Sequence, residues 1–211
     1  MAFPSINEFK EQLLDGGARP SLFEMTLTFP TGVVGSAAGI PAVVAMSKTR
    51  FHCRISEIPG TQHNPITLKF AGREVKYAGQ RVFNNLSLTI INDEAFSVRR
   101  GLEAWFEAMN TRESNKSKLS SPTSSGYAGT GEVFQYNKKG NKIRGYKFVD
   151  LFPVTLAPIS LDWSNDGAIE DYTCEFAYQY WEPSGVGPFG FVDRAFDPEA
   201  GPTGPEGPIT I

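Results

Sequence analysis

Apolar and polar residues alternate along several short segments of this chain. Every second position is apolar over 23–29 and again over 86–90. A strand directs successive side chains to opposite faces, so this period predicts strands with one buried and one exposed face. Segment 50–58 alternates in the same way and is predicted to be a strand. Its buried face would carry Phe51, Cys53 and Ile55.

Three hairpins are predicted. Residues 161–183 suggest two strands around Asn165-Asp166-Gly167, because Asp-Gly favours a tight turn with positive φ. Segment 131–156 suggests a second hairpin that turns at 139–141. Segment 66–79 suggests two short strands bent at Ala71-Gly72, after a loop over 59–67. One face of the strand after Gly167 would carry Tyr172, Cys174, Phe176, Tyr178 and Tyr180.

The period changes to that of a helix at residues 93–110. Asn92 or Asp93 is a plausible N-cap. The apolar stripe is Val98, Leu102, Trp105, Phe106 and Met109, and the opposite face carries Phe96, Arg100, Glu103 and Glu107. A short N-terminal helix is predicted from the capping-box pattern Ser5 to Glu8, with Ile6, Phe9 and Leu13 at helical spacing.

Three segments lack a clear period. Residues 30–48 are small, apolar and glycine-rich, which suggests a long loop or a β-excursion that either covers the core or meets a partner. Residues 111–131 suggest a flexible loop or a segment ordered by a partner, and 183–211 suggest a Gly/Pro-rich C-terminal extension. The organisation expected is therefore a domain over 1–182 with two loop insertions, followed by an extension.

Composition restricts the possible functions. The chain has 211 residues, a net charge of −3, and 16 Phe, 7 Tyr and 3 Trp, which suit one largely β domain. There is no basic excess to neutralise a nucleic-acid backbone. The N-terminus lacks the features of a secretion signal, and no apolar run is long enough to span a bilayer. A soluble protein made in a cytoplasm is expected.

A search for catalytic chemistry finds little. His52 and His63 do not have a metal-ligand spacing, and the glycines at 126–131 lack the lysine of a phosphate-binding loop. The two cysteines, Cys53 and Cys174, are interpreted as buried thiols, with a disulfide left open. We therefore expect no enzyme activity, no metal site and no cofactor, and a surface used for assembly.

The sequence resembles the tail tube proteins of contractile-tailed bacteriophages. Four blocks carry the resemblance, in order, over about 18–182. The first two are ARPSLF from residue 18 and FHC from residue 51 through Pro59-Gly60. The third runs from YAGQRVFNN at residue 77 through INDEA, with Arg99 and Trp105 beyond, and the fourth runs from Phe152-Pro153 through Leu161-Asp162-Trp163 to Tyr180-Trp181-Glu182. The resemblance implies a β-barrel or two-sheet antiparallel sandwich with a flanking helix. It also implies rings of six copies that stack into a hollow tube inside a contractile sheath.

The resemblance also suggests partners. These are further copies of the chain, a sheath protein, a baseplate initiator and a tail terminator. DNA would pass through the lumen without specific binding. The protein would be assembled in the host cytoplasm and become part of the virion. We expect the ring or stacking interface to include Pro59, Gly60, Gln62, Asn64, Lys69, Arg73 and Lys76. We expect the outer helix face, with Phe96, Arg100, Glu103 and Glu107, to contact the sheath or a neighbouring subunit.

Two alternatives remain at this stage. The chain could be another part of a related machine: a baseplate tube initiator, a bacteriocin tube or a type VI secretion tube. A β-sandwich carbohydrate-binding module is an alternative of a different class, because aromatic side chains serve sugar stacking.

Overall fold

The computed structural model describes residues 5–13, 17–34, 39–119, 121–123, 125–164 and 167–184. The helices are α1 (Ile6–Gln12), α2 (Thr31–Val34), α3 (Gly39–His52) and α4 (Ser97–Met109). The strands are β1 (Phe23–Thr28), β2 (Cys53–Ile55), β3 (Gln62–Phe70), β4 (Arg73–Val82), β5 (Leu86–Ile91), β6 (Gly129–Tyr136), β7 (Lys142–Leu156), β8 (Asp171–Ala177) and β9 (Tyr180–Ser184). The expectation of a mainly β fold is confirmed.

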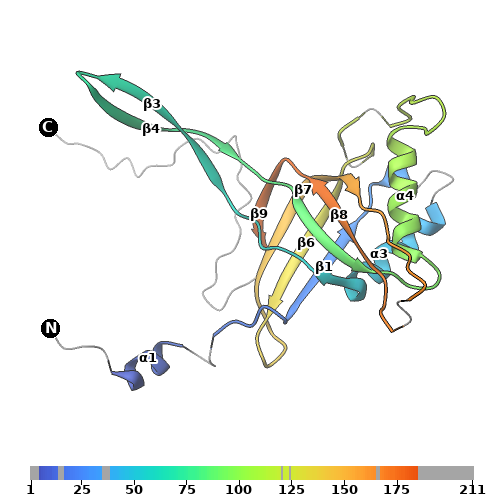
Figure 1. Cartoon of the computed structure of the whole chain (residues 1–211), viewed down its shortest axis with the longest axis horizontal. Coiled ribbons are helices and arrows are strands. Elements are labelled where there is room, and N and C mark those ends of the chain that lie inside the picture. The colour runs from blue at the N-terminus through green and yellow to red at the C-terminus, as the bar shows by residue number, and fades with distance from the viewer. Residues whose placement is uncertain are drawn as a thin grey trace, which may run out of the picture.

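Seven of the strands form one antiparallel sheet in the order β1-β6-β7-β8-β5-β2, with β9 also paired to β7 (Figure 1). The long strand β7 bends the sheet, because its first part pairs with β9 and its last part with β8. Asp150 lies between the two parts with a positive φ of 53°, and the register with β6 shifts there. An irregularity of this kind increases local twist, so the sheet curls around its core.

The core lies between this curled sheet and the helices α3 and α4. Every second residue of β5 and β8 is buried, as the sequence predicted. Trp105 of α4 is completely buried; its ring centroid lies 4.7 Å from that of Phe29 and 6.3 Å from that of Phe176. Its indole N–H donates to the backbone oxygen of Tyr127 over 2.8 Å, which fixes the end of the 111–131 segment against the core.

Helix α4 begins four residues later than expected. Phe96 is its N-cap in a left-handed conformation and makes no side-chain cap bond. The Asp93 carboxylate instead accepts hydrogen bonds from the Ser97 backbone N–H at 2.6 Å and the Ser97 hydroxyl at 2.6 Å. Phe96 therefore lies before the helix rather than on its outer face, which corrects the predicted position of this residue.

Most of the segment 30–48 lies in the helices α2 and α3, so the prediction of a loop or β-excursion is wrong there; residues 35–38 lie outside the described residues. Ala42, Ala45 and Thr49 are buried at spacings of three and four residues, where small side chains let α3 approach α4 closely. The Thr49 hydroxyl is satisfied by donating to the Ala45 carbonyl over 2.7 Å. The sequence period was obscured because the buried positions are small and the helix is apolar on several sides.

Two predicted strands also differ from the structure. Helix α3 continues through His52, so β2 is only three residues long, and Phe51 and Ile55 are 76% and 52% exposed rather than inward. Residues 161–164 form no strand, and Trp163 is fully exposed. Of the predicted turn, Asn165 and Asp166 lie outside the described residues, as does the C-terminal extension beyond Ser184.

The hairpin predicted over 131–156 and the N-terminal helix are confirmed. The first turns around Gly140, which has a φ of +81°, and joins β6 to β7. Helix α1 has the expected capping box: the Ser5 backbone N–H donates to the Glu8 carboxylate over 2.7 Å, and the Glu8 backbone N–H donates to the Ser5 hydroxyl over 3.2 Å.

A salt bridge ties the start of α4 to α3 and supplies a pH-dependent stability term. Lys48 Nζ lies 2.7 Å from an Asp93 carboxylate oxygen and 2.8 Å from the Ser97 hydroxyl oxygen. Although desolvation opposes the shift, hydrogen bonds from Lys48 and Ser97 lower the pKa of Asp93 below its ordinary value. The ionised form therefore stabilises the fold above the unfolded-state pKa of about 3.9.

Replacing Asp93→Asn is expected to lower the free energy of unfolding at pH 7 by about 1–3 kcal/mol, because a charge-assisted cap and an ion-pair partner are lost. Urea unfolding from pH 7 to pH 2 measures this. The gap to wild type should persist down to about pH 4 and shrink below it, because Asp93 takes up a proton in the unfolded state at a higher pH than in the folded state. The exposed neighbour Glu94, replaced by Gln, is the control; a gap that widened at low pH would contradict this role of Asp93.

Candidate functional site: the assembly surfaces

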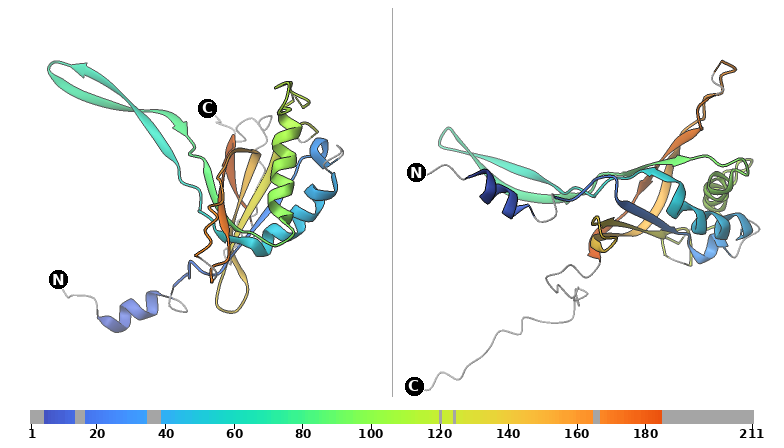
Figure 2. Two further views of the ribbon diagram at one scale, coloured as in Figure 1. Left: turned by 45° about the vertical axis from the view of Figure 1, so that its right-hand side comes forward. Right: turned by 90° about the horizontal axis from the view of Figure 1, so that it is seen from below.

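Strands β3 and β4 form a two-stranded arm that projects from the body of the molecule (Figures 1 and 2). The bend at Ala71-Gly72 is confirmed, and both residues have positive φ, at 49° and 79°. The predicted loop over 59–67 is wrong from Gln62 onward, because β3 begins there. We call residues 62–82 the arm.

The arm has two chemically different faces. In an antiparallel pair, residues directly opposite each other share a face, and successive pairs alternate. The pairs Ile66–Tyr77 and Leu68–Val75 therefore lie on one face, with Phe70 beyond them at the end of β3. The intervening pairs, Thr67–Lys76 and Lys69–Glu74, lie on the other face. We call these the apolar face and the polar face of the arm.

An exposed apolar face of this kind is typical of a surface that binds a partner. All five of its large side chains are at least one third exposed, although they are of types that normally pack. A two-stranded hairpin alone is at best marginally stable in water, and it becomes stable when a further strand or a helix covers one side. The arm is thus suited to be covered by another chain.

The root of the arm is anchored to the body. The Trp181 indole N–H donates to the Gly60 carbonyl over 3.1 Å. The guanidinium of Arg81 lies 5.8 Å from the centroid of the Trp181 ring and 5.4 Å from that of Phe83. These contacts fix where the arm leaves the sheet, while the rest of it extends into solvent.

The sequence-predicted interface residues are distributed along this arm and its approach. Pro59 and Gly60 precede it, and Gly60 is engaged by Trp181. The others are exposed on the arm itself: Gln62, Asn64, Lys69, Arg73 and Lys76. The prediction favoured polar residues and missed the apolar face, although the alternation of Ile66, Leu68 and Phe70 with polar residues was a readable signal.

The outer face of α4 is partly neutralised within the chain. Glu103 accepts from Arg99 over 3.3 Å, and Glu107 lies 3.3 Å from Arg112 and 4.0 Å from Lys118. Arg100 is exposed, and no ion pair is recorded for it in the described part of the chain. Phe96 is 41% exposed at the N-cap next to this face.

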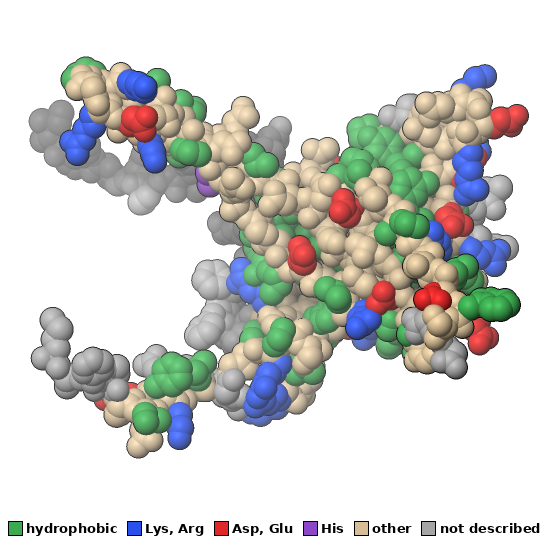
Figure 3. Space-filling view, viewed as in Figure 1, with side chains coloured by type: hydrophobic (Ala, Val, Ile, Leu, Met, Phe, Trp, Pro, Cys, Tyr) green, Lys and Arg blue, Asp and Glu red, His purple; other side chains and the backbone are tan. Residues whose placement is uncertain are grey.

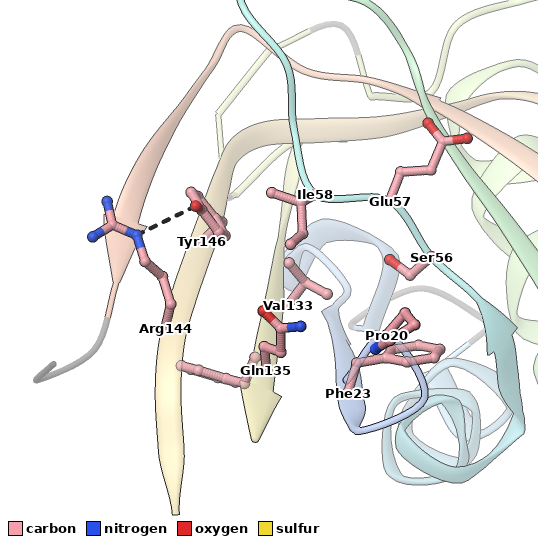
Figure 4. A pocket seen from close by; sticks show the side chains of 10 residues that line it. Pro20, Phe23, Ser56, Glu57, Ile58, Val133, Gln135, Arg144 and Tyr146 are labelled. Carbon is pink, nitrogen blue, oxygen red and sulfur yellow. Dashed lines mark hydrogen bonds between the residues drawn. The ribbon is translucent and has the colours of Figure 1, made fainter. Parts of the chain in front are cut away.

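A small pocket lies between β1, β6, β7 and the segment that leads to the arm (Figure 4). Phe23, Ile58 and Tyr146 contribute apolar surface, and the Arg144 guanidinium donates to the Tyr146 hydroxyl over 3.2 Å. Its volume is about 140 Å³, well below the roughly 300–1,000 Å³ of small-molecule sites. A pocket of this size can receive a single side chain.

Reactive groups are scarce in the part of the chain that the structure describes. It contains no group of three or more His, Cys, Asp or Glu residues that could hold a metal ion. Cys53 and Cys174 are free thiols, and burial raises the pKa of each to about 12. They are therefore protonated and unreactive at neutral pH. Among the described helices, none is both long and apolar enough to cross a membrane.

A curled antiparallel sheet with a projecting arm, whose apolar face is exposed among the described residues, is typical of a structural subunit of an assembly. The sequence matches the family described as phage tail tube protein over residues 18–184, and the chain belongs to this family. The resemblance inferred from the sequence blocks is thereby confirmed, with the expected role as a tail tube protein.

Individual relatives agree with this assignment. The tail tube protein gp19 of Enterobacteria phage T4 is 24% identical over 166 residues, which cover 78% of this chain and 91% of that protein. The tail tube protein of Serratia phage KSP90 is 24% identical over 185 residues, which cover 82% and 94% of the two chains. The tube-terminating cap of the anti-feeding prophage has a similar fold, with a TM-score of 0.52 at 14% identity over 79% of this chain and 90% of that one.

Proposed function

We propose that this chain is the tube subunit of a contractile phage tail, in which rings of six copies stack into a hollow tube inside a sheath. The observation that carries the proposal is the arm, whose apolar face is left exposed by the residues of its own chain that the structure describes. A heterologous contact repeated by rotation closes a ring, and one repeated by translation builds a filament. The arm supplies a contact of this kind, since it is separate from the sheet that forms the body.

The partners and location follow from the same proposal. Further copies of the chain are the main partners, with a sheath protein outside, a baseplate initiator at one end and a terminator at the other. A solved sheath–tube complex of an extracellular contractile injection system, with a TM-score of 0.51 at 12% identity over 87% of this chain and 100% of the other, supports the fold on which this rests. Assembly takes place in the host cytoplasm, and the product is part of the virion.

The tube is a conduit rather than a catalyst. We propose no enzymatic activity and no cofactor, and DNA transits the lumen without specific binding. The net charge of −3 supports this, because a wall without basic excess does not retain phosphates by counterion release. We further propose that residues 1–182 form the tube domain and that 183–211 are an extension of it.

Negative-stain electron microscopy of the purified protein, with mass measured by light scattering, tests the proposal. Hollow tubes, or rings of about 139 kDa for six chains of 23.1 kDa, are the expected result. A chain that stayed monomeric at high concentration, even with a baseplate template, would contradict it. In purified particles a tube subunit should be abundant, whereas an initiator would be present in a few copies at one end.

The outer face of α4 is proposed to meet the sheath or a neighbouring subunit. Reversing the charges of Arg100, Glu103 and Glu107 is expected to reduce sheathed tails, counted in micrographs, while the protein stays folded. Arg100→Glu alone should account for most of the loss, because Glu103 and Glu107 already have partners in their own chain. Reversal of the exposed Lys138 is the control; a normal yield of sheathed tails from the triple variant would refute this assignment.

A further inference from the structure

The segment 185–211 differs in charge from the rest of the chain. It contains four acidic residues and one basic residue, which together account for the whole net charge of −3. These residues are Asp193, Asp197, Glu199 and Glu206, against Arg194. The match to the family ends at residue 184, so this acidic segment is a feature of the chain that the family match does not cover.

The acidic segment leaves the body beside a strongly basic stretch. Ser184, the last described residue, pairs with Gly145 of β7. Gly145 lies within 133–149, which carries five basic residues and no acidic one. Figure 3 shows Lys and Arg side chains gathered at the free end of the β6–β7 hairpin, the lowest part of the body in that view. The segment therefore begins where opposite charge is concentrated, and at short range opposite charges attract most strongly.

Two basic side chains flank the edge of β7 just beyond the end of β9. Lys142 Nζ lies 3.6 Å from the centroid of the Phe134 ring, and Phe134 pairs with Gly145. Arg144 pairs with Gln135, the next residue of β6, so it lies on the opposite face of the sheet. Both basic side chains are exposed, and neither makes an ion pair with a described residue. The edge between them has no described partner strand, because the pairing with β9 stops at Gly145.

The pocket of Figure 4 offers the segment an apolar anchor. Its lining includes Arg144, which is next to the residue paired with Ser184. Phe189 and Phe191 follow Ser184 closely, so an extended chain of about 3.3–3.6 Å per residue can bring their rings to the pocket. The Ser56 hydroxyl oxygen also belongs to the lining and is buried without a hydrogen-bond partner among the described residues. A segment that enters the pocket can supply both an aromatic ring and a backbone N–H for this oxygen.

We propose that the acidic segment 185–199 docks on its own subunit. It passes along the edge of β7 between Lys142 and Arg144, and one of its two rings, Phe189 or Phe191, fills the pocket. Its own subunit is the partner because the segment starts at the site, which gives it an effective concentration in the millimolar range. The docked segment also covers a strand edge that would otherwise promote aggregation. A single chain makes this contact, so the inference does not depend on the proposed tube function.

Limited digestion of the full chain with trypsin tests the docking, because Arg194 is the only basic residue of the segment. Cleavage there releases the end of the chain, and mass spectrometry of the released peptide gives the initial rate. Replacing Lys142→Glu together with Arg144→Glu is expected to raise this rate at least tenfold, because repulsion replaces attraction. The matched control, Lys69→Glu with Lys76→Glu, makes the same charge change on the polar face of the arm and should stay within about twofold of the wild type.

Three results would overturn the docking. Equal rates in the wild type and in the Lys142→Glu, Arg144→Glu variant would mean that the segment does not lie on the hairpin. A larger increase from the control pair would place the segment on the arm. Protection of the wild type that is lost on hundredfold dilution would assign the segment to a second copy, whereas a constant rate is expected. Thermal unfolding of both variants should match the wild type, since all four replaced side chains are exposed.

The digestion needs no assembled tubes, so its outcome is separate from that of the electron microscopy. A chain that forms tubes but loses the end of the segment equally fast in every variant retains the proposed function and loses only this inference. A chain whose segment is protected but which forms neither rings nor tubes retains the docking, while the proposed function fails.

Discussion

Replacing Leu68→Thr together with Val75→Thr is expected to abolish tubes at concentrations where the wild type forms them. The two residues face each other across the arm, and threonine preserves their strand preference while removing apolar surface. If a neighbouring subunit buries both side chains, the replacement weakens the free energy of association by about 2–3 kcal/mol per subunit contact. The concentration needed for assembly then rises by roughly 30- to 150-fold. Sedimentation of tubes across a concentration series measures this shift.

The next pair along the arm is the matched control. Lys69→Thr with Glu74→Thr changes the polar face one residue pair further from the body. This pair should shift the assembly concentration by less than about fivefold, since exposed ion pairs contribute at most about 1 kcal/mol. Thermal unfolding of both variants should match the wild type, because the arm adds little to the core. If the polar pair reduced assembly more than the apolar pair did, the polar face of the arm, which carries the predicted interface residue Lys69, would form the subunit contact instead.

Replacing Trp105→Ala is expected to destabilise the monomer by about 3–5 kcal/mol. The side chain is completely buried, packs between Phe29 and Phe176, and satisfies the Tyr127 carbonyl. Its removal leaves a large cavity and an orphaned acceptor. A loss of this size is a large part of the stability of a domain, so most of the variant should be insoluble or unfolded near 37 °C. Urea unfolding of the soluble fraction measures the change.

Trp163→Ala provides the comparison, because Trp163 has the same chemistry but is fully exposed. Its effect on the free energy of unfolding should stay within about 0.5 kcal/mol. If Trp163→Ala reduces assembly without reducing stability, it identifies a third contact surface next to the exposed Leu161 and Ile169. Equal destabilisation by the two tryptophan replacements would contradict the placement of the core around α4.

The sequence alone determined the elements in which local pattern and packing agree. Strands β5 and β8 were predicted because alternate residues are large and apolar on the buried side only. Helix α4 was predicted because its apolar stripe is continuous and its other side is charged. The bends at Ala71-Gly72 and Gly140 were also readable, since both require positive φ. The four sequence blocks, in their order along the chain, identified the family, which no single hydrophobic pattern could identify.

Only the tertiary structure decided the rest, because those features depend on what a segment packs against. Helix α3 was missed since its buried positions are small residues whose role appears only when α4 lies beside them. The alternation over 50–58 resembled a strand, but the chain remains helical through His52. Local alternation likewise predicted two strands at the bend of the arm but not that they project from the body. That projection, which leaves an apolar face exposed among the described residues, results from the way the chain leaves the sheet near Trp181.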